Sequence, residues 1–145
     1  LRISGNRAQE LAHTIPADRQ DFKYAPGKWT VRELLCHMID SERVFAYRAL
    51  CFARNDKTPL PGFDEQAYAP ESNAQGRELK DIMAEMAHLR TTTIDLFASF
   101  SNDMLSRNGV ANENGFSVAS LGFIIAGHET HHVNILKERY ISAWS

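Results

Sequence analysis

Residues 117–132 read SVASLGFIIAGHETHH, a mostly apolar run that ends in three of the chain's six histidines. Ser117 is a favourable helix N-cap, and Phe116 before it can pack against Leu121 as a hydrophobic staple. Apolar residues then recur at helical spacing, which predicts a helix over residues 118–141. A helix with one long apolar face needs other helices to bury it.

Three further segments carry apolar residues at helical spacing, and no segment shows the sustained alternation of a β-strand. They are residues 1–15, which Pro16 ends, residues 30–54, and residues 75–100. The second segment begins with Thr30 and Glu33, a capping box in which a hydroxyl and a carboxylate satisfy free backbone amides. The sequence therefore predicts an all-α fold, a single four-helix-bundle domain over residues 1–145.

Two connections interrupt this helical pattern. Residues 55–74 are so rich in proline and glycine that we expect neither helix nor strand there. A connection as long as residues 55–74 is expected to be either a crossover between parallel helices or a cover over an active site. Residues 101–115 predict a short helical turn and an irregular stretch that ends in the turn Asn112–Gly115.

The composition is that of an ordinary globular protein, with 43% hydrophobic and 23% charged residues. The formal net charge is −2 and basic residues are scattered singly, which argues against nucleic acid as a partner. No apolar run reaches the roughly 18 residues of a membrane span, and Leu1–Ser4 do not begin a signal peptide, so we expect no membrane partner. Cys36 and Cys51 fall too far apart in one predicted helix to bridge, which fits a reducing cytoplasmic location.

His128 and His132 fall where the helical pattern calls for core residues. They are four positions apart, about 40° around a helix, which is the spacing of a two-histidine metal clamp. Burying an imidazole costs free energy unless its nitrogens find partners, and a metal ion would satisfy both rings. The alternative is that the rings bond to neighbouring residues or border a water-filled cleft.

A third metal ligand has to come from another helix. His37 is the best candidate because it lies beside the apolar face of residues 30–54. Cys36 is expected to face away from that side, so it is not a ligand. His88 lies off the main apolar face of residues 75–100, and His13 lies close to Pro16, which ends the first helix, so we expect both to be solvated.

The same stretch also matches the zinc-peptidase motif H-E-x-x-H through His128, Glu129 and His132. Such enzymes need a third ligand, and the one acidic residue downstream, Glu138, is turned about 240° away on the same helix. There is also no predicted strand to align an extended peptide substrate. We therefore interpret Glu129 as a coincidental match on the flank of the helix and keep the peptidase as a minor alternative.

Three residues are predicted to orient or tune the site. Glu42 falls within an apolar face, so its carboxylate needs either a metal-bound imidazole N–H or an arginine such as Arg48 or Arg139. His131 lies about 60° from His128 and either faces the substrate or lies at the surface edge. Arg48, at the side of the apolar face, is the third of these residues.

Several segments together resemble the DinB/YfiT-like superfamily. The matching residues are Tyr24–Thr30, Glu33, His37–Arg48, Leu60–Asp64, Gly127–His132, Ile135–Leu136 and Glu138–Tyr140. The resemblance implies a four-helix bundle with an up-down-down-up order and a divalent ion, zinc or nickel in similar proteins. The ligands of that ion match His37, His128 and His132 one by one.

Proteins of this superfamily include thiol S-transferases that use bacillithiol or mycothiol, and a thiol-dependent isomerase. Three histidines leave coordination positions open, as in catalytic metal sites. We expect a metal-dependent transferase that joins a low-molecular-weight thiol to a small electrophile, tuned by Glu42, His131 or Arg48. The alternatives are a metal-dependent hydrolase of a small substrate and a non-catalytic, stress-related metal-binding module, and pairing into a homodimer is a further expectation.

Overall fold

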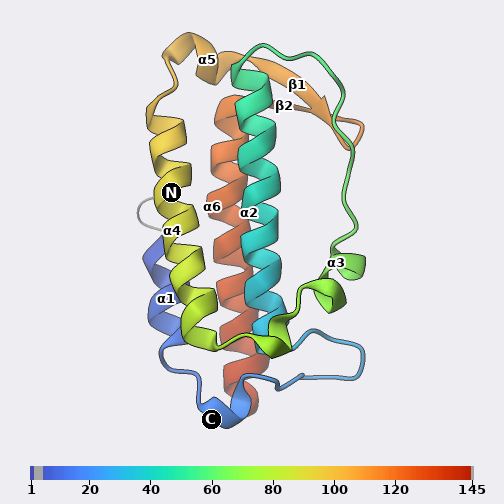
Figure 1. Ribbon diagram of the computed structural model, residues 1–145, viewed down its shortest axis with the longest axis vertical. Helices are drawn as coiled ribbons and strands as arrows, with labels where there is room; N and C mark the ends of the chain where they lie inside the picture. Colours follow the sequence, from blue (N-terminus) through green and yellow to red (C-terminus); the bar gives the residue numbers. More distant parts are fainter. Residues whose placement is uncertain (2–4, 145) are drawn as a thin grey trace.

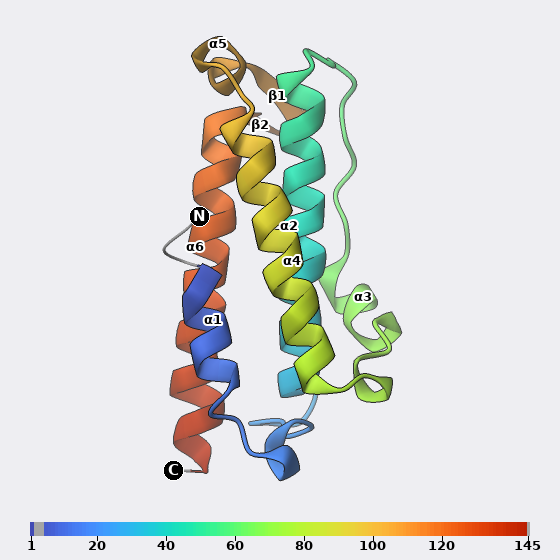
Figure 2. The same cartoon turned by 60° about the vertical axis from the view of Figure 1, so that its left-hand side comes forward.

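Four helices form the body of the molecule. The computed structural model describes residue 1 and residues 5–144. The bundle helices are α1 (Gly5–Ala12), α2 (Val31–Ala53), α4 (Leu79–Ala98) and α6 (Val118–Ile135). α2 packs against α4 and α6, and α1 packs against the same two helices, so the four form a closed bundle as predicted. In Figures 1 and 2, α2 and α4 ascend while α1 and α6 descend.

α2 begins where the capping box predicts. The backbone N–H of Glu33 donates to Thr30 Oγ1 at 3.0 Å, and the N–H of Thr30 donates to Glu33 Oε2 at 2.7 Å. The helix ends at Ala53, and Asn55 then adopts a left-handed backbone conformation with φ of 62°. The predicted helix over residues 30–54 is therefore confirmed.

The connection between α2 and α4 is more ordered than predicted. It descends along the outside of the bundle (Figure 1) and contains α3 (Glu65–Glu71) and a 3₁₀ turn (Ala74–Gly76). The expectation of no helix there was wrong because Asp64 caps α3. Its Oδ1 accepts hydrogen bonds from the backbone N–H groups of Gln66 and Ala67, at 2.9 and 3.2 Å. α4 begins at Leu79 instead of residue 75.

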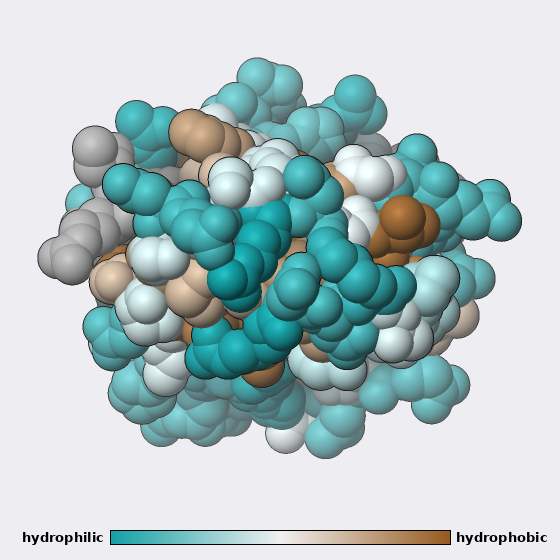
Figure 3. Space-filling model, turned by 90° about the horizontal axis from the view of Figure 1, so that it is seen from above, coloured by the Kyte–Doolittle hydropathy of each residue, from teal (hydrophilic) through white to brown (hydrophobic). Residues whose placement is uncertain are grey.

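A small β-hairpin closes one end of the bundle. The predicted helical turn is α5 (Asn102–Ser106), and after it β1 (Asn108–Ala111) pairs antiparallel with β2 (Asn114–Ser117). The two residues between the strands have φ of 48° and 63°, the positive values that a two-residue hairpin turn requires. The all-α prediction was wrong here, because strands of four residues are too short to show an alternating pattern. Figure 3 looks down on this end, whose surface is mostly hydrophilic.

The chain termini follow the predicted helices with small changes. Ser117 caps α6 by accepting a hydrogen bond from the N–H of Ser120 at 3.0 Å. After Ile135 the chain continues into a π-helical turn (Leu136–Tyr140) and a 3₁₀ turn (Ile141–Ala143). α1 ends at Ala12, before the predicted residue 15, and Ile3 of that pattern lies outside the described residues.

The core consists of two apolar clusters with a band of polar side chains between them. One cluster includes Leu34, Leu35 and Val133, and the other includes Phe52 and Leu121. The polar band comprises His37, Ser41, Glu42, Arg90, Thr93, His128, Glu129 and His132. None of the described helices is long and apolar enough to cross a membrane. The polar band is where the candidate functional residues lie.

Candidate metal centre

Three histidine side chains meet in the polar band. His37 belongs to α2, and His128 and His132 lie on adjacent turns of α6. Each pair of their Nε2 atoms is 3.1 Å apart. His37 and His132 are buried, and His128 is half-buried. The packing of α2 against α6 thus brings together residues that are 91 and 95 positions apart in the chain.

Aromatic side chains hold this cluster from the outside. The ring of Trp29 lies 4.6 Å from the ring of His37, centroid to centroid, and Phe45 lies 5.7 Å from His128. Tyr140 donates a 2.8 Å hydrogen bond from its hydroxyl to the backbone oxygen of Trp29. Since Trp29 directly precedes the N-cap of α2, the capping box and Tyr140 together fix its position relative to His37.

Burial keeps the three imidazoles neutral. It lowers the pKa of His37 and of His128 to about 4, and in each case a neighbouring histidine adds to the effect. Burial lowers the pKa of His132 to about 3, with further contributions from the other histidines. Among the described residues, Nδ1 of His132 is buried without a hydrogen-bond partner. At neutral pH the cluster therefore offers uncharged nitrogen donors.

The donor set fits a divalent ion. Histidine nitrogens bind zinc at about 2.0–2.1 Å, so two of them at angles of 90–110° on one ion are about 2.9–3.4 Å apart. The observed 3.1 Å separations fall within that range. Each Nε2 atom carries either a lone pair or a hydrogen, so without a cation at least one of the three pairs must bring two like groups together, and like groups repel. Three imidazoles suit ions such as zinc or nickel better than the oxygen-seeking magnesium or calcium.

A buried arginine between two carboxylates ties the three long helices together. Arg90 of α4 donates to both carboxylate oxygens of Glu42 of α2, at 2.9 and 2.8 Å, and its Nη1 lies 2.6 Å from Glu129 Oε2 of α6. Their exposed fractions are only 7%, 6% and 4% in that order. Glu42 thus forms the salt bridge that was one of its two predicted alternatives, but with Arg90 instead of Arg48 or Arg139.

This ion triad (Arg90, Glu42 and Glu129) also corrects the interpretation of Glu129. The expectation that Glu129 lies on the flank of its helix was wrong, because its side chain is buried against Arg90. The cluster of potential metal ligands found among the described residues contains the three histidines and not Glu129. The match to H-E-x-x-H therefore does not place the carboxylate of Glu129 among the three histidine nitrogens.

The other predicted site residues do not belong to the cluster of three histidines. Arg48 is buried, but it donates a 3.0 Å hydrogen bond to the backbone oxygen of Pro61 and so anchors the connection after α2. His131 is exposed, with its ring 5.0 Å from that of His132.

Cys36 is buried in the core instead of facing away, and burial raises the pKa of its thiol. His13 and His88 are exposed, as predicted.

Sequence reasoning missed one acidic residue at the cluster. Glu65, the first residue of α3, places Oε2 3.7 Å from Nε2 of His37, and its side chain is 50% exposed. The connection that contains Glu65 was predicted to be irregular, so no helical face was assigned to it. The capping residue Asp64 is the signal that could have located α3 and with it Glu65.

The fold and the histidines define a class of protein, helical bundles in which three imidazoles converge. Comparison with known proteins places the chain in such a family. The sequence matches the DinB superfamily over residues 1–136, and the chain belongs to this superfamily. A protein of Oceanobacillus iheyensis that is named as a proposed metal-dependent hydrolase is 27% identical over 136 residues. The match covers 91% of this chain and 76% of that protein.

Two solved structures share the fold. YfiT from Bacillus subtilis, described as a proposed metal-dependent hydrolase with an unusual four-helix bundle topology, has a TM-score of 0.83 and 19% identity. The likeness covers 98% of this chain and 83% of YfiT. A DinB-like protein from the same organism has a TM-score of 0.65 and 19% identity, over 98% of this chain and 88% of that chain. At this level of identity the likeness concerns the fold.

Proposed function

We propose that this protein is a metal-dependent hydrolase of a small substrate, in which His37, His128 and His132 hold one divalent ion, zinc or nickel. The observation that carries the proposal is the 3.1 Å spacing of three buried or half-buried Nε2 atoms. The names of the O. iheyensis protein and of YfiT support it. An ion on three histidines retains open positions and supplies Lewis acidity and an acidified water molecule.

The residues around the histidines prepare these donors. Because the pKa values of the three imidazoles are about 3 to 4, no proton has to leave them before they bind an ion at neutral pH. Trp29 packs on His37, and Tyr140 holds Trp29 in place. The ion triad fixes α6, which carries two of the donors, against α2 and α4.

Glu65 is the residue best placed to move protons. Its Oε2, 3.7 Å from Nε2 of His37, can accept a proton from a water molecule that attacks the substrate and pass it to the leaving group. In that step the water oxygen bonds to the substrate, and the bond to the leaving group breaks. Glu129 is unsuited to this role because its carboxylate is paired with Arg90.

A second candidate activity is the transfer of a low-molecular-weight thiol to a small electrophile. In that reaction the sulfur of the thiolate bonds to the electrophilic carbon, and the leaving group departs with the electron pair. Cys36 and Cys51 are free but buried, and burial raises the pKa of Cys36. The thiol therefore has to come from solution, so dependence on added thiol separates this candidate from hydrolysis. A metal-binding module without catalysis is the third candidate.

Metal analysis of untagged protein tests the three-histidine metal site, which all three candidate functions share. We expect about one zinc or nickel ion per chain in the wild type, and almost none in His37→Ala and His132→Ala. His88→Ala is the matched control, because His88 is exposed on α4. Equal metal content in all four proteins would overturn the assignment of the ligands.

Turnover assays then distinguish the activities. A panel of small esters and amides is incubated with metal-loaded protein, with and without bacillithiol, and both product and free thiol are measured. Product formed without thiol supports the hydrolase. Product formed only with consumption of thiol supports the transferase, and a loaded protein inactive on both panels supports the non-catalytic module.

A further inference from the structure

A cavity of about 160 Å³ lies beside the three histidines, between the loop before α2, the start of α3 and the end of α6. Three aromatic side chains, Tyr24, Trp29 and Tyr140, line it together with the aliphatic Leu34 and Ile135. The rings of Tyr24 and Tyr140 contact each other edge to face at 4.9 Å. The lining thus combines these packed aromatic and aliphatic side chains with the polar side chains of Lys28, Gln66 and His132.

This cavity, which we name the aromatic cavity, adjoins the proposed metal centre. His132 forms part of its wall. Trp29 forms another part, and its ring also packs on His37 at 4.6 Å. On the side of α3, Gln66 lines the cavity directly after Glu65, the proposed proton acceptor. A group held in the cavity therefore lies against His132, one of the three clustered histidines, and against Trp29, which packs on a second one.

We infer that the aromatic cavity binds an aryl group of the substrate, so that the substrate class is small aryl esters or amides. The inference rests on the proposed function and adds the substrate class to it. An apolar cavity of about 150 Å³ is known to bind benzene, so about 160 Å³ matches one six-membered ring. Aromatic walls favour aromatic guests through stacked and edge-to-face contacts.

The polarity of the walls argues against other occupants. A sugar carries hydroxyl groups on all sides and would leave some of them unpaired against Leu34 and Ile135, at a cost in free energy for each group. Polar groups occur instead among the exposed residues of the lining, Lys28 and Gln66. A ring with a polar reactive end fits this distribution better than a molecule that is polar throughout.

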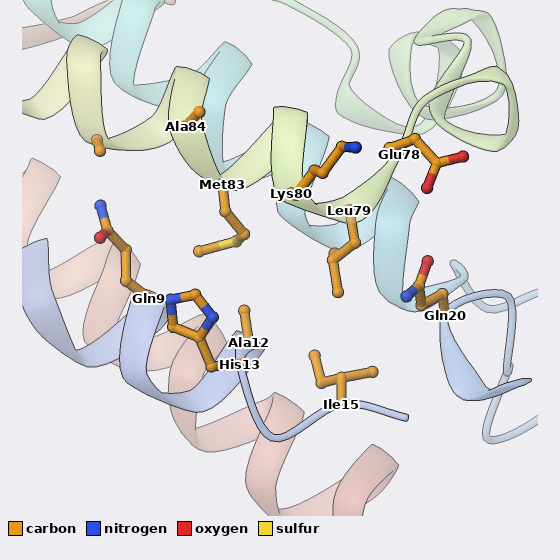
Figure 4. Close-up of a pocket in the computed structure, with 11 residues that line it drawn as sticks. Gln9, Ala12, His13, Ile15, Gln20, Glu78, Leu79, Lys80, Met83 and Ala84 are labelled. Carbon is orange, nitrogen blue, oxygen red and sulfur yellow. The ribbon is translucent and has the colours of Figure 1, made fainter. Parts of the chain in front are cut away.

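A larger groove elsewhere on the molecule is not the substrate site. It lies between α1 and the start of α4, has a volume of about 480 Å³, and is lined by side chains such as Gln9, His13 and Met83 (Figure 4). None of the three clustered histidines lines it. Its one histidine, His13, is exposed and belongs to no cluster of potential ligands among the described residues.

Hydroxamate probes test the inference without relying on turnover. Hydroxamates bind open metal positions, so cobalt-loaded protein is titrated with benzohydroxamate and with acetohydroxamate, and binding is followed by the visible absorption of cobalt. We expect benzohydroxamate to bind at least about tenfold more tightly, because its ring enters the aromatic cavity. Gln66→Trp and Ile135→Phe, which fill the cavity, should each reduce this preference to about threefold or less. Gln75→Trp, at an exposed position outside the lining, should retain it.

The outcomes separate the inference from the proposed function. If both hydroxamates perturb cobalt but bind equally, or if both filling variants keep the full preference, the inference is overturned and the metal centre stands. If wild-type protein retains neither cobalt nor zinc nor nickel, the proposed function is overturned. Saturation-transfer NMR with benzamide and acetamide then measures the aryl preference in metal-free protein with the same variants. A preference for benzamide that the filling variants remove supports the cavity assignment, and its absence overturns it.

Discussion

Replacement of Arg90 by leucine tests whether the ion triad holds the bundle together at the level of the histidines. Arg90 pairs with Glu42 and Glu129, both of which are more than nine-tenths buried. Removing one partner of a buried ion pair costs about 3–5 kcal/mol, because the other charge stays buried without compensation. With two carboxylates left unpaired, we expect Arg90→Leu to cost about 4–5 kcal/mol. For a domain with a total stability of about 5–15 kcal/mol, this is a large but measurable fraction.

Urea unfolding followed by circular dichroism measures this loss in metal-free protein. The matched control is Arg43→Leu, because Arg43 is 50% exposed and pairs with Glu85 at 2.5 Å at the surface. Such a surface pair contributes at most about 1 kcal/mol. A loss in Arg90→Leu no larger than in this control would refute the argument.

A triple variant shows whether charge or packing is responsible. Replacing Arg90, Glu42 and Glu129 all by leucine removes the uncompensated charges together with the arginine. Apolar replacements of buried ion pairs are often neutral or stabilising, so most of the lost stability should return. A triple variant as unstable as Arg90→Leu would show that the shape of these side chains matters, and not their charge.

Acid, hydrogen-bond and proton-transfer tests address the site itself. The free energy of unfolding of the metal-free protein should fall as the pH drops from about 6.5 to about 4, because unfolded imidazoles bind protons that the folded ones, with pKa values of about 3 to 4, cannot. Thermal unfolding at stepped pH measures this, and a flat profile would contradict it. Tyr140→Phe should cost about 1–3 kcal/mol in urea unfolding, since the backbone oxygen of Trp29 loses its donor. It should also weaken zinc binding several-fold in chelator competition, whereas unchanged affinity would argue against a positioning role. Glu65→Gln should lower kcat about 100-fold or more at unchanged metal content. Full activity in that variant would exclude Glu65 as the proton acceptor.

Local signals in the sequence predicted the helices well. The capping box at Thr30 and Glu33 and the N-cap at Ser117 act within one turn of a helix, so their effect depends little on the rest of the chain. The four-residue spacing of His128 and His132 likewise follows from helical geometry alone. These features needed no tertiary information.

Features that depend on context were the ones predicted wrongly. α3 and the hairpin of β1 and β2 are short, and a periodic pattern over so few residues is indistinguishable from an irregular segment. Cys36 and Glu129 are buried by neighbours outside their own helices. Helical periodicity indicates which residues share a face, but it cannot tell how many neighbouring helices cover that face.

Local patterns in the sequence suffice to predict the main helices and to place His128 and His132 on one face of α6. The tertiary structure decided what meets that face: His37 at 3.1 Å from both, the ion triad, Glu65 on α3 and the aromatic cavity beside His132. The physical reason is that caps and helical spacing are interactions between residues a few positions apart. Contacts between distant residues depend on how the helices pack. That packing is set by the charge and volume of side chains from several helices at once, so a local pattern in the sequence does not reveal it.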